Sequence, residues 1–183
     1  PVAGDDRITA QFKQFVDDQI DQFKKDTAWA TDPSVAPAEA QALTLDITYR
    51  EERATHVDNY IFTIVTYTGG AHGLQATQIF SFDQNGKLLN LDDIFTDKQA
   101  GLKALSLYVT KELTTRRVSD ANWIAEGAGP TIENYQNIVL TDAGITAIFD
   151  PYQVAAYAAG PQTVQIPLSA FASVVNKDLF VTR

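Results

Sequence analysis

The chain has 183 residues, 45% of them hydrophobic, which suits one domain or two closely packed lobes with a real core. Its 14 Lys and Arg against 23 Asp and Glu give a net charge of −9, which argues against nucleic acid and anionic membrane surfaces and is compatible with a basic protein partner. No apolar run approaches the ~20 residues of a membrane span, and cysteine is absent, which excludes a disulfide framework and thiolate chemistry.

The sequence contains no methionine and begins at Pro1, without a basic segment followed by an apolar run. We therefore expect a mature or excised fragment. Any leader, lipid anchor or membrane segment would lie upstream of Pro1.

The first half of the sequence predicts one helix and three strands. Residues 5–25 carry apolar side chains at spacings of three and four, which indicates an amphipathic helix. Residues 43–50 alternate between apolar and polar side chains, as a half-buried strand does. Residues 57–68 and 74–83 are two further strands, and Asn85-Gly86 is a strong turn signal.

The second half predicts a helix, a hairpin and a final strand. Residues 96–99 have the sequence of a capping box, with threonine at the cap and glutamine three positions later. Residues 119–137 indicate a loop with one helical turn near 132–135. Residues 138–149 predict a hairpin, and residues 164–168 a last short strand before a helical turn capped by Ser169.

This order of elements predicts an α+β fold, an antiparallel sheet with helices packed on one face. The strands are too consecutive for a doubly wound parallel sheet. We expect residues 1–50 to form a smaller helix-plus-strand lobe packed against a domain of residues 51–183.

The run from Tyr67 to Gly73, Tyr-Thr-Gly-Gly-Ala-His-Gly, is the most informative motif. Its glycines tolerate positive φ and close backbone approach, so it predicts a tight connection between two strands with His72 at its tip. The imidazole either hydrogen-bonds within the turn and fixes it, or contacts a partner, as loop tips often do. Tyrosine is a common interface anchor. The candidate binding residues are Tyr67, Gly69, Gly70, His72, Gly73, Tyr152 and Tyr157.

Signals for catalysis or cofactor binding are weak. With two histidines and no cysteine, a zinc site would need carboxylates, and no metal-binding, nucleophile-elbow or phosphate-loop motif is present. Asp92 and Asp93 are the most visible carboxylate pair, and we interpret them as a solvated turn. We expect no catalytic residue, no metal and no cofactor. A hydrolase that attacks cell-wall glycans through two carboxylates is the alternative.

Two segments resemble a known family. Residues 60–95 contain the glycine run, and residues 149–168 contain Phe-Asp-Pro-Tyr-Gln-Val-Ala-Ala-Tyr. Both are similar to the extracytoplasmic domain of unknown function shared by RsiV-type lysozyme-sensing anti-sigma factors and PdaC-type proteins associated with peptidoglycan deacetylation. Residues 1–50 resemble, more weakly, the smaller domain that precedes it.

The resemblance implies an extracytoplasmic α+β domain, periplasmic or at the cell surface. In the anti-sigma factor this region binds lysozyme, whereas in the deacetylases the chemistry belongs to a separate metal-dependent domain. The sequence includes neither that domain nor the sigma-binding segment. The implied function is a non-enzymatic cell-envelope binding domain for lysozyme, another basic protein or peptidoglycan fragments.

Overall fold

The structure is a computed structural model that describes residues 6–31 and 42–180. The chain divides into two compact units, of which the first comprises Pro1–Thr48 with Thr63–Ala76 and the second Tyr49–Phe62 with Thr77–Arg183. The division cuts across the long strands of one sheet. The lobe boundary at residue 50 stays a prediction.

The first unit contains helix α1 (Asp6–Asp26), followed by the one-turn helix η1 (Ala28–Thr31). Aspartate in the first turn and lysines in the last turn of α1 complement the helix dipole. Its apolar stripe is partly buried, and Ile8 is the most buried residue of the helix. The predicted helix is confirmed.

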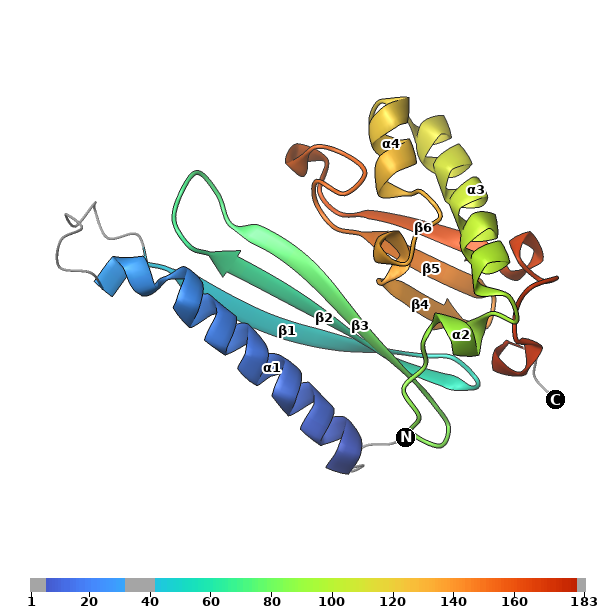
Figure 1. Cartoon of the computed structure of the whole chain (residues 1–183), viewed down its shortest axis with the longest axis horizontal. Helices are drawn as coiled ribbons and strands as arrows, with labels where there is room; N and C mark the ends of the chain where they lie inside the picture. The colour runs from blue at the N-terminus through green and yellow to red at the C-terminus, as the bar shows by residue number, and fades with distance from the viewer. Residues whose placement is uncertain (1–5, 32–41, 181–183) are drawn as a thin grey trace. The chain divides into compact units, whose positions relative to one another are not determined.

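Three strands, β1 (Thr44–Arg53), β2 (Val57–Tyr67) and β3 (Leu74–Asp83), form a sheet in the order β1-β2-β3. They appear in cyan to green in Figure 1. The predicted strands are confirmed, and β1 continues past its predicted end. Aromatic rings join the strands on one face, because Phe62 lies 5.3 Å from Tyr49 and 5.7 Å from Phe80 between ring centroids.

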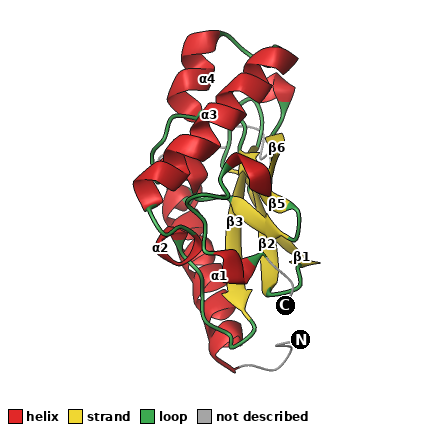
Figure 2. Ribbon diagram, turned by 90° about the vertical axis from the view of Figure 1, so that its right-hand side faces the viewer, coloured by secondary structure: helices red, strands yellow, loops and turns green. Residues whose placement is uncertain are grey.

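The second unit also contains the antiparallel sheet β4-β5-β6, made of Ile138–Thr141, Gly144–Phe149 and Gln162–Pro167. Helices α3 (Lys98–Arg116) and α4 (Ala121–Gly127) lie on one face of this sheet (Figures 1 and 2). The apolar side of α3 is fully buried in the core with the inward residues of β5 and β6. The α+β class is confirmed. The core includes Leu102, Leu105, Val109, Leu113, Ile145, Phe149, Val164 and Ile166.

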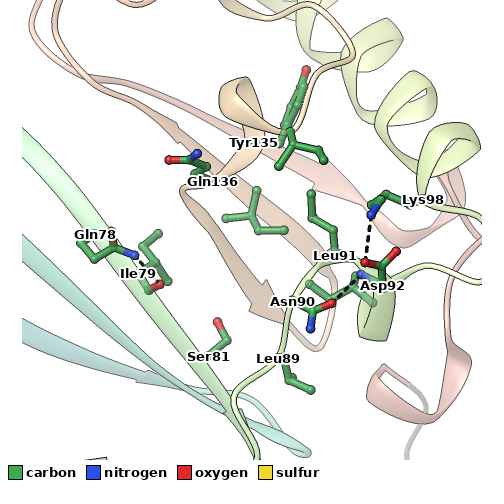
Figure 3. Close-up of a pocket in the computed structure, with 13 residues that line it drawn as sticks. Gln78, Ile79, Ser81, Leu89, Asn90, Leu91, Asp92, Lys98, Tyr135 and Gln136 are labelled. Atoms are coloured by element: carbon green, nitrogen blue, oxygen red, sulfur yellow. Dashed lines mark hydrogen bonds and ion pairs between the residues drawn. The ribbon is translucent and has the colours of Figure 1, made fainter. Parts of the chain in front are cut away.

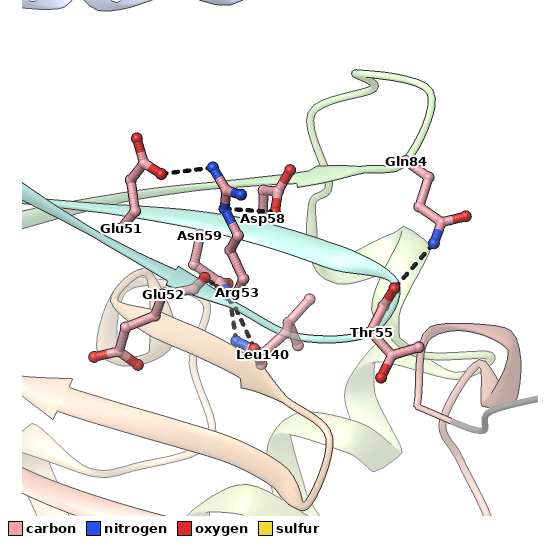
Figure 4. A network of polar contacts seen from close by, with 8 residues as sticks. All are labelled: Glu51, Glu52, Arg53, Thr55, Asp58, Asn59, Gln84 and Leu140. Atoms are coloured by element: carbon pink, nitrogen blue, oxygen red, sulfur yellow. Dashed lines mark hydrogen bonds and ion pairs between the residues drawn. The ribbon is translucent and has the colours of Figure 1, made fainter. Parts of the chain in front are cut away.

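The buried side chain of Asn59 links β2 to β4, as Figure 4 shows, and it also bonds to Ser81 of β3. Its Nδ2 donates to the carbonyls of Glu52 (3.0 Å) and Leu140 (2.9 Å). Its Oδ1 accepts from the Leu140 N–H (3.1 Å) and the Ser81 hydroxyl (2.8 Å). The amide therefore uses both donors and both acceptor positions, which makes this buried polar residue fully satisfied.

The predicted capping box at residues 96–99 is wrong. Helix α3 is capped by Asp97, whose carboxylate accepts from the Ala100 N–H at 3.0 Å. The Thr96 N–H instead donates to the Val174 carbonyl at 2.9 Å. The reciprocal capping box lies one turn earlier, where Asn90 and Asp93 cap the short helix α2 (Leu91–Ile94).

Part of the predicted loop at residues 119–137 is helix α4. Asp120 caps it by accepting two backbone N–H groups. The helix ends at Gly127, where a Cβ would lie 1.8 Å from the Gln153 carbonyl oxygen. The predicted turn near 132–135 is confirmed as η2 (Glu133–Tyr135). Further one-turn helices are η3 (Tyr157–Ala159), η4 (Leu168–Ala170) and η5 (Lys177–Leu179). The predicted cap at Ser169 is wrong, because Ser169 lies inside η4 and Pro167 occupies the cap position.

Candidate functional site

The glycine run connects β2 to β3 and is held by its own bonds. Gly69 and Gly70 both have a φ of +102°, which side chains rarely adopt. The Tyr67 hydroxyl donates to the Gly70 carbonyl at 2.9 Å. A Cβ on Gly69 would lie 3.3 Å from the Trp29 ring. The run is therefore a tight turn that requires glycine, as the sequence predicts.

His72 lies exposed in this turn. Its Nδ1 is 2.9 Å from the carbonyl oxygen of Gly73, and because that oxygen can only accept, Nδ1 carries the proton in this bond. The local bond fits the structural interpretation of His72, and the exposure fits the binding interpretation. Its part in binding stays a prediction.

Tyr152 and Tyr157 are brought together, with ring centroids 5.5 Å apart. Tyr152 is 48% exposed and has a φ of +73°. Its carbonyl accepts from the Trp123 indole at 3.0 Å, which holds this segment against α4. The tyrosine pair belongs to the second unit and the glycine turn to the first, so a joint role for them stays a prediction.

The second unit contains a cleft of about 370 Å³ with mainly apolar walls, here called the apolar cleft (Figure 3). This volume falls within the range of small-ligand sites. Polar groups from four elements stand at its margin. The lining residues are Gln78, Ile79 and Ser81 of β3; Leu89, Asn90, Leu91, Asp92 and Ile94 around α2; Lys98 of α3; and Ile132, Tyr135, Gln136 and Ile138 around η2 and β4.

Local bonds orient the polar margin of the apolar cleft. Lys98 Nζ lies 2.9 Å from Asp92 Oδ2, and both groups are drawn in Figure 3. The Asp92 N–H donates to the Asn90 side chain at 2.8 Å. Burial raises the pKa of the Tyr135 hydroxyl, which donates into the core rather than toward solvent. The phenol therefore contributes an apolar wall.

A second cleft of about 420 Å³, here called the acidic cleft, shares Leu89 and Asp92 with the apolar cleft. Four of the described residues that line it are aspartates, against one lysine and one histidine. They are Asp83, Asp92, Asp93, Asp178, Lys87 and His56. An apolar surface and an acidic surface therefore adjoin in this unit.

Two carboxylates of the acidic cleft are fixed by hydrogen bonds. Asp83 Oδ1 accepts from the N–H groups of Asn85 and Lys87, both at 2.9 Å. Asp93 pairs with the Lys87 ammonium and accepts from the Asn90 N–H at 3.0 Å, and these bonds lower the pKa of Asp93. Both carboxylates are thus oriented by these bonds, and the lowered pKa keeps Asp93 ionised.

Sequence reasoning missed the apolar cleft because its walls come from separate segments. Ile79, Ile132 and Ile138 each follow ordinary local patterns that indicate burial and no more. The signal available was Ile132, an apolar residue two positions after the Gly129-Pro130 loop signal, and it is 42% exposed. Asp92 and Asp93, predicted as a turn, lie in the first turn of α2.

The fold and the clefts define an α+β domain with adjoining apolar and acidic surfaces. Within residues 6–31 and 42–180, no group of three or more His, Asp or Glu side chains is placed to hold a metal ion. In the same residues, no helix has the length and hydropathy of a membrane span.

Residues 92–169, less than half of the chain, match the family described as "Protein of unknown function (DUF3298)". Two relatives are similar in sequence. The peptidoglycan-N-acetylmuramic acid deacetylase PdaC of Bacillus subtilis is 26% identical over 180 residues, 97% of this chain and 38% of PdaC. The immunogenic protein MPT64 of Mycobacterium tuberculosis is 28% identical over 116 residues, 63% of this chain and 50% of MPT64. The chain spans half or less of these relatives.

Two crystal structures share the fold. A DUF3298 family protein from Pseudomonas aeruginosa superposes with a TM-score of 0.66 at 22% identity, covering 80% of this chain and 68% of that one. A DUF3298 family member from Bacteroides fragilis superposes with a TM-score of 0.62 at 23% identity, covering 93% and 71%. The predicted resemblance to the domain found in PdaC-type proteins is confirmed.

Proposed function

We propose that this chain is a non-enzymatic binding domain of the cell envelope, periplasmic or at the cell surface, that recognises a basic protein such as lysozyme. The likeness to PdaC, whose name refers to peptidoglycan, supports an envelope location. The observation that carries the proposal is the acidic cleft beside the apolar cleft.

The acidic cleft suits a basic partner for two reasons. Asp83 and Asp93 are already held by backbone N–H groups, so binding would cost little further side-chain ordering. Asp92 and Asp178 are exposed and extend the negative charge to the margin. Complementary charge raises the association rate and selects against acidic partners, and the net charge of −9 acts in the same direction.

Hydrolysis of glycans receives less support. A two-carboxylate mechanism needs one acid with a raised pKa and a second that stays ionised. Of the described residues that line the apolar cleft, Asp92 is the only carboxylate, and it is paired with Lys98. In the acidic cleft the pKa of Asp93 is lowered, the opposite of what a general acid requires.

The test is a titration of the purified chain with hen lysozyme and with soluble peptidoglycan fragments, at about 0.05 M and about 0.2 M salt. We expect lysozyme binding that weakens as salt rises. Binding of the glycan without lysozyme would replace this proposal with a cell-wall module. Absence of lysozyme binding at high micromolar concentration would overturn it.

Two variants at the margin of the acidic cleft test whether this surface binds lysozyme. Asp92→Asn and Asp178→Asn should each weaken lysozyme binding about threefold, because each removes one exposed charge. The matched control is Glu126→Gln, which removes one exposed charge on α4, away from the residues that line either cleft. An equal effect of all three variants would show that only the net charge matters.

A further inference from the structure

We infer that the apolar cleft binds a free amino acid with a large aliphatic side chain, in its zwitterionic form. The side chain of the ligand lies against the apolar walls of the cleft. Its ammonium group pairs with Asp92, and its carboxylate pairs with Lys98. This inference goes beyond the proposed function and does not rest on recognition of a basic protein.

The walls of the apolar cleft come from aliphatic side chains of separate segments. Ile79 belongs to β3, Leu91 begins α2, and Ile138 begins β4. Ile132 directly precedes η2. Ile79 and Ile138 are buried whereas Ile132 is 42% exposed, so the apolar surface extends from the interior to the solvent. A volume of about 370 Å³ has room for one aliphatic side chain, which gains free energy by leaving water.

A cation and an anion lie together at one side of these walls. Lys98 Nζ is 2.9 Å from Asp92 Oδ2, and Figure 3 shows the pair next to Leu91. The Lys98 side chain is 30% exposed and the Asp92 side chain is 68% exposed. An ion pair so open to water adds little to stability. A ligand can therefore separate the two groups at small cost.

Helix caps fix the backbone of both charged residues. Asp92 lies in the first turn of α2, where its N–H donates to Asn90 Oδ1 at 2.8 Å. Lys98 is the first residue of α3 and follows the cap Asp97, whose carboxylate accepts from the Ala100 N–H at 3.0 Å. Because the backbone is already in place, a ligand has only the ends of the two side chains to order, which favours affinity.

Unused hydrogen-bonding capacity remains at the same side of the cleft. The Lys98 ammonium has three donors, and within the described residues its partner is Asp92. The Asn90 amide accepts through Oδ1, while its Nδ2 donates to none of the described residues. These donors suit a carboxylate, which accepts several hydrogen bonds at once. The Asp92 carboxylate, in turn, has acceptor positions left for an ammonium group.

A zwitterion complements both charges, whereas other classes of ligand complement one or none. A fatty acid would bring its carboxylate close to Asp92 as well as to Lys98. An apolar amine would bring its ammonium group close to Lys98 as well as to Asp92. Like charges at such short range disfavour each other. A residue inside a peptide chain has neither charge on its backbone, and a neutral sugar has no aliphatic side chain. The walls and the ion pair together favour a free amino acid.

The experiment titrates the purified chain with L-leucine and follows the isoleucine methyl signals by nuclear magnetic resonance. We expect saturable shifts for Ile79, Ile132 and Ile138, with a Kd below about 1 mM. Two analogues test the charges of the ligand, because N-acetyl-L-leucine lacks the ammonium group and L-leucinamide lacks the carboxylate. Each analogue should bind at least about tenfold more weakly, since each loses one charged partner.

Two charge variants assign each group of the ligand to its residue. In Asp92→Asn, the preference for L-leucine over N-acetyl-L-leucine should fall to about twofold or less, while the preference over L-leucinamide remains. In Lys98→Gln, the preference over L-leucinamide should fall in the same way, while the preference over N-acetyl-L-leucine remains. Unchanged preferences in both variants would show that the ion pair only joins α2 to α3, and would overturn the inference.

Further variants locate the site and separate it from recognition of lysozyme. Ile132→Gln removes apolar surface from the cleft and should weaken L-leucine binding about fivefold. Leu107 is 75% exposed on α3 outside the cleft, and Leu107→Gln should leave L-leucine binding unchanged. Asp178 lines the acidic cleft and not the apolar cleft, so Asp178→Asn should weaken binding of lysozyme but not of L-leucine.

Two results of the titration would overturn the inference. One is the absence of saturable L-leucine binding up to about 10 mM. The other is equal binding of L-leucine and its two analogues, because the charges would then play no part. Salt-sensitive lysozyme binding would survive either result, so the proposed function is tested separately.

Discussion

Removal of the Asn59 side chain should destabilise the protein more than any other single amide deletion among the described residues. In Asn59→Ala, the N–H and C=O of Leu140 lose their partners in a buried environment. The Ser81 hydroxyl and the Glu52 carbonyl also lose a bond, although the latter is only partly buried and can regain water.

The magnitude follows from these four groups. Each buried polar group left unsatisfied costs about 1–3 kcal/mol. Two fully buried backbone groups, with smaller contributions from the other two, give a loss of about 4 kcal/mol in the free energy of unfolding. Such a loss is a large part of the typical stability of a single domain.

The assay is urea denaturation at pH 7, followed by circular dichroism, with Asn122→Ala as the control. Asn122 is exposed in α4, so its replacement should change the free energy of unfolding by less than about 0.5 kcal/mol. A loss below about 1 kcal/mol for Asn59→Ala would refute the view that this amide joins β2 to β4.

The Asn59→Asp variant adds a pH test of the same reasoning. The new carboxylate would face the carbonyl oxygens of Glu52 and Leu140 in a buried site, so its pKa in the folded state would rise above the unfolded value of about 4. A raised pKa means that stability falls as pH rises. The deficit relative to the wild-type protein should therefore be smallest below pH about 4 and largest at pH 7.

Three further predictions concern other parts of the chain. Gly127→Ala should lower the free energy of unfolding in urea by at least about 4 kcal/mol, because the added Cβ would overlap the backbone of Gln153. Gly160→Ala should lower it by about 1 kcal/mol, because a Cβ there has open space and only the φ of +66° is unfavourable. The hydrogen bond from Lys87 is the chief cause of the lowered pKa of Asp93, so the ionised carboxylate stabilises the folded state, and this contribution is lost as the pH falls through the pKa that Asp93 has in the folded protein. The free energy of unfolding of Asp93→Asn should therefore fall less than that of the wild-type protein between pH about 5 and about 2. His72→Ala should leave stability within about 0.5 kcal/mol, and a larger loss would favour a structural role.

The sequence predicts accurately those elements in which apolar residues recur at a regular spacing. The strand at residues 74–83 is found with its predicted bounds, and the amphipathic helix at the N-terminus is one residue displaced at each end. Cap positions are less predictable, because Thr96 and Asp97 are both good cap residues. The choice between them depends on a bond from Thr96 to Val174, which lies far away in the sequence.

The sequence predicted only the part of the candidate site whose residues are neighbours along the chain. The glycine turn between two strands follows from its composition and is found there, with its internal bonds. The clefts were not predictable, because their walls combine residues of β3, α2, η2 and β4. Ile79 and Ile138 lie on edge strands of two different sheets, a property of sheet order that side-chain patterns do not encode.

The most direct test of the central claim compares native hen lysozyme with lysozyme whose lysines have been succinylated, in titrations of the same chain. Succinylation replaces positive charges by negative ones. Recognition through the acidic cleft predicts binding of the native protein and at least about tenfold weaker binding of the modified one. Equal affinity for both forms would contradict the account, because charge complementarity would then play no part in recognition.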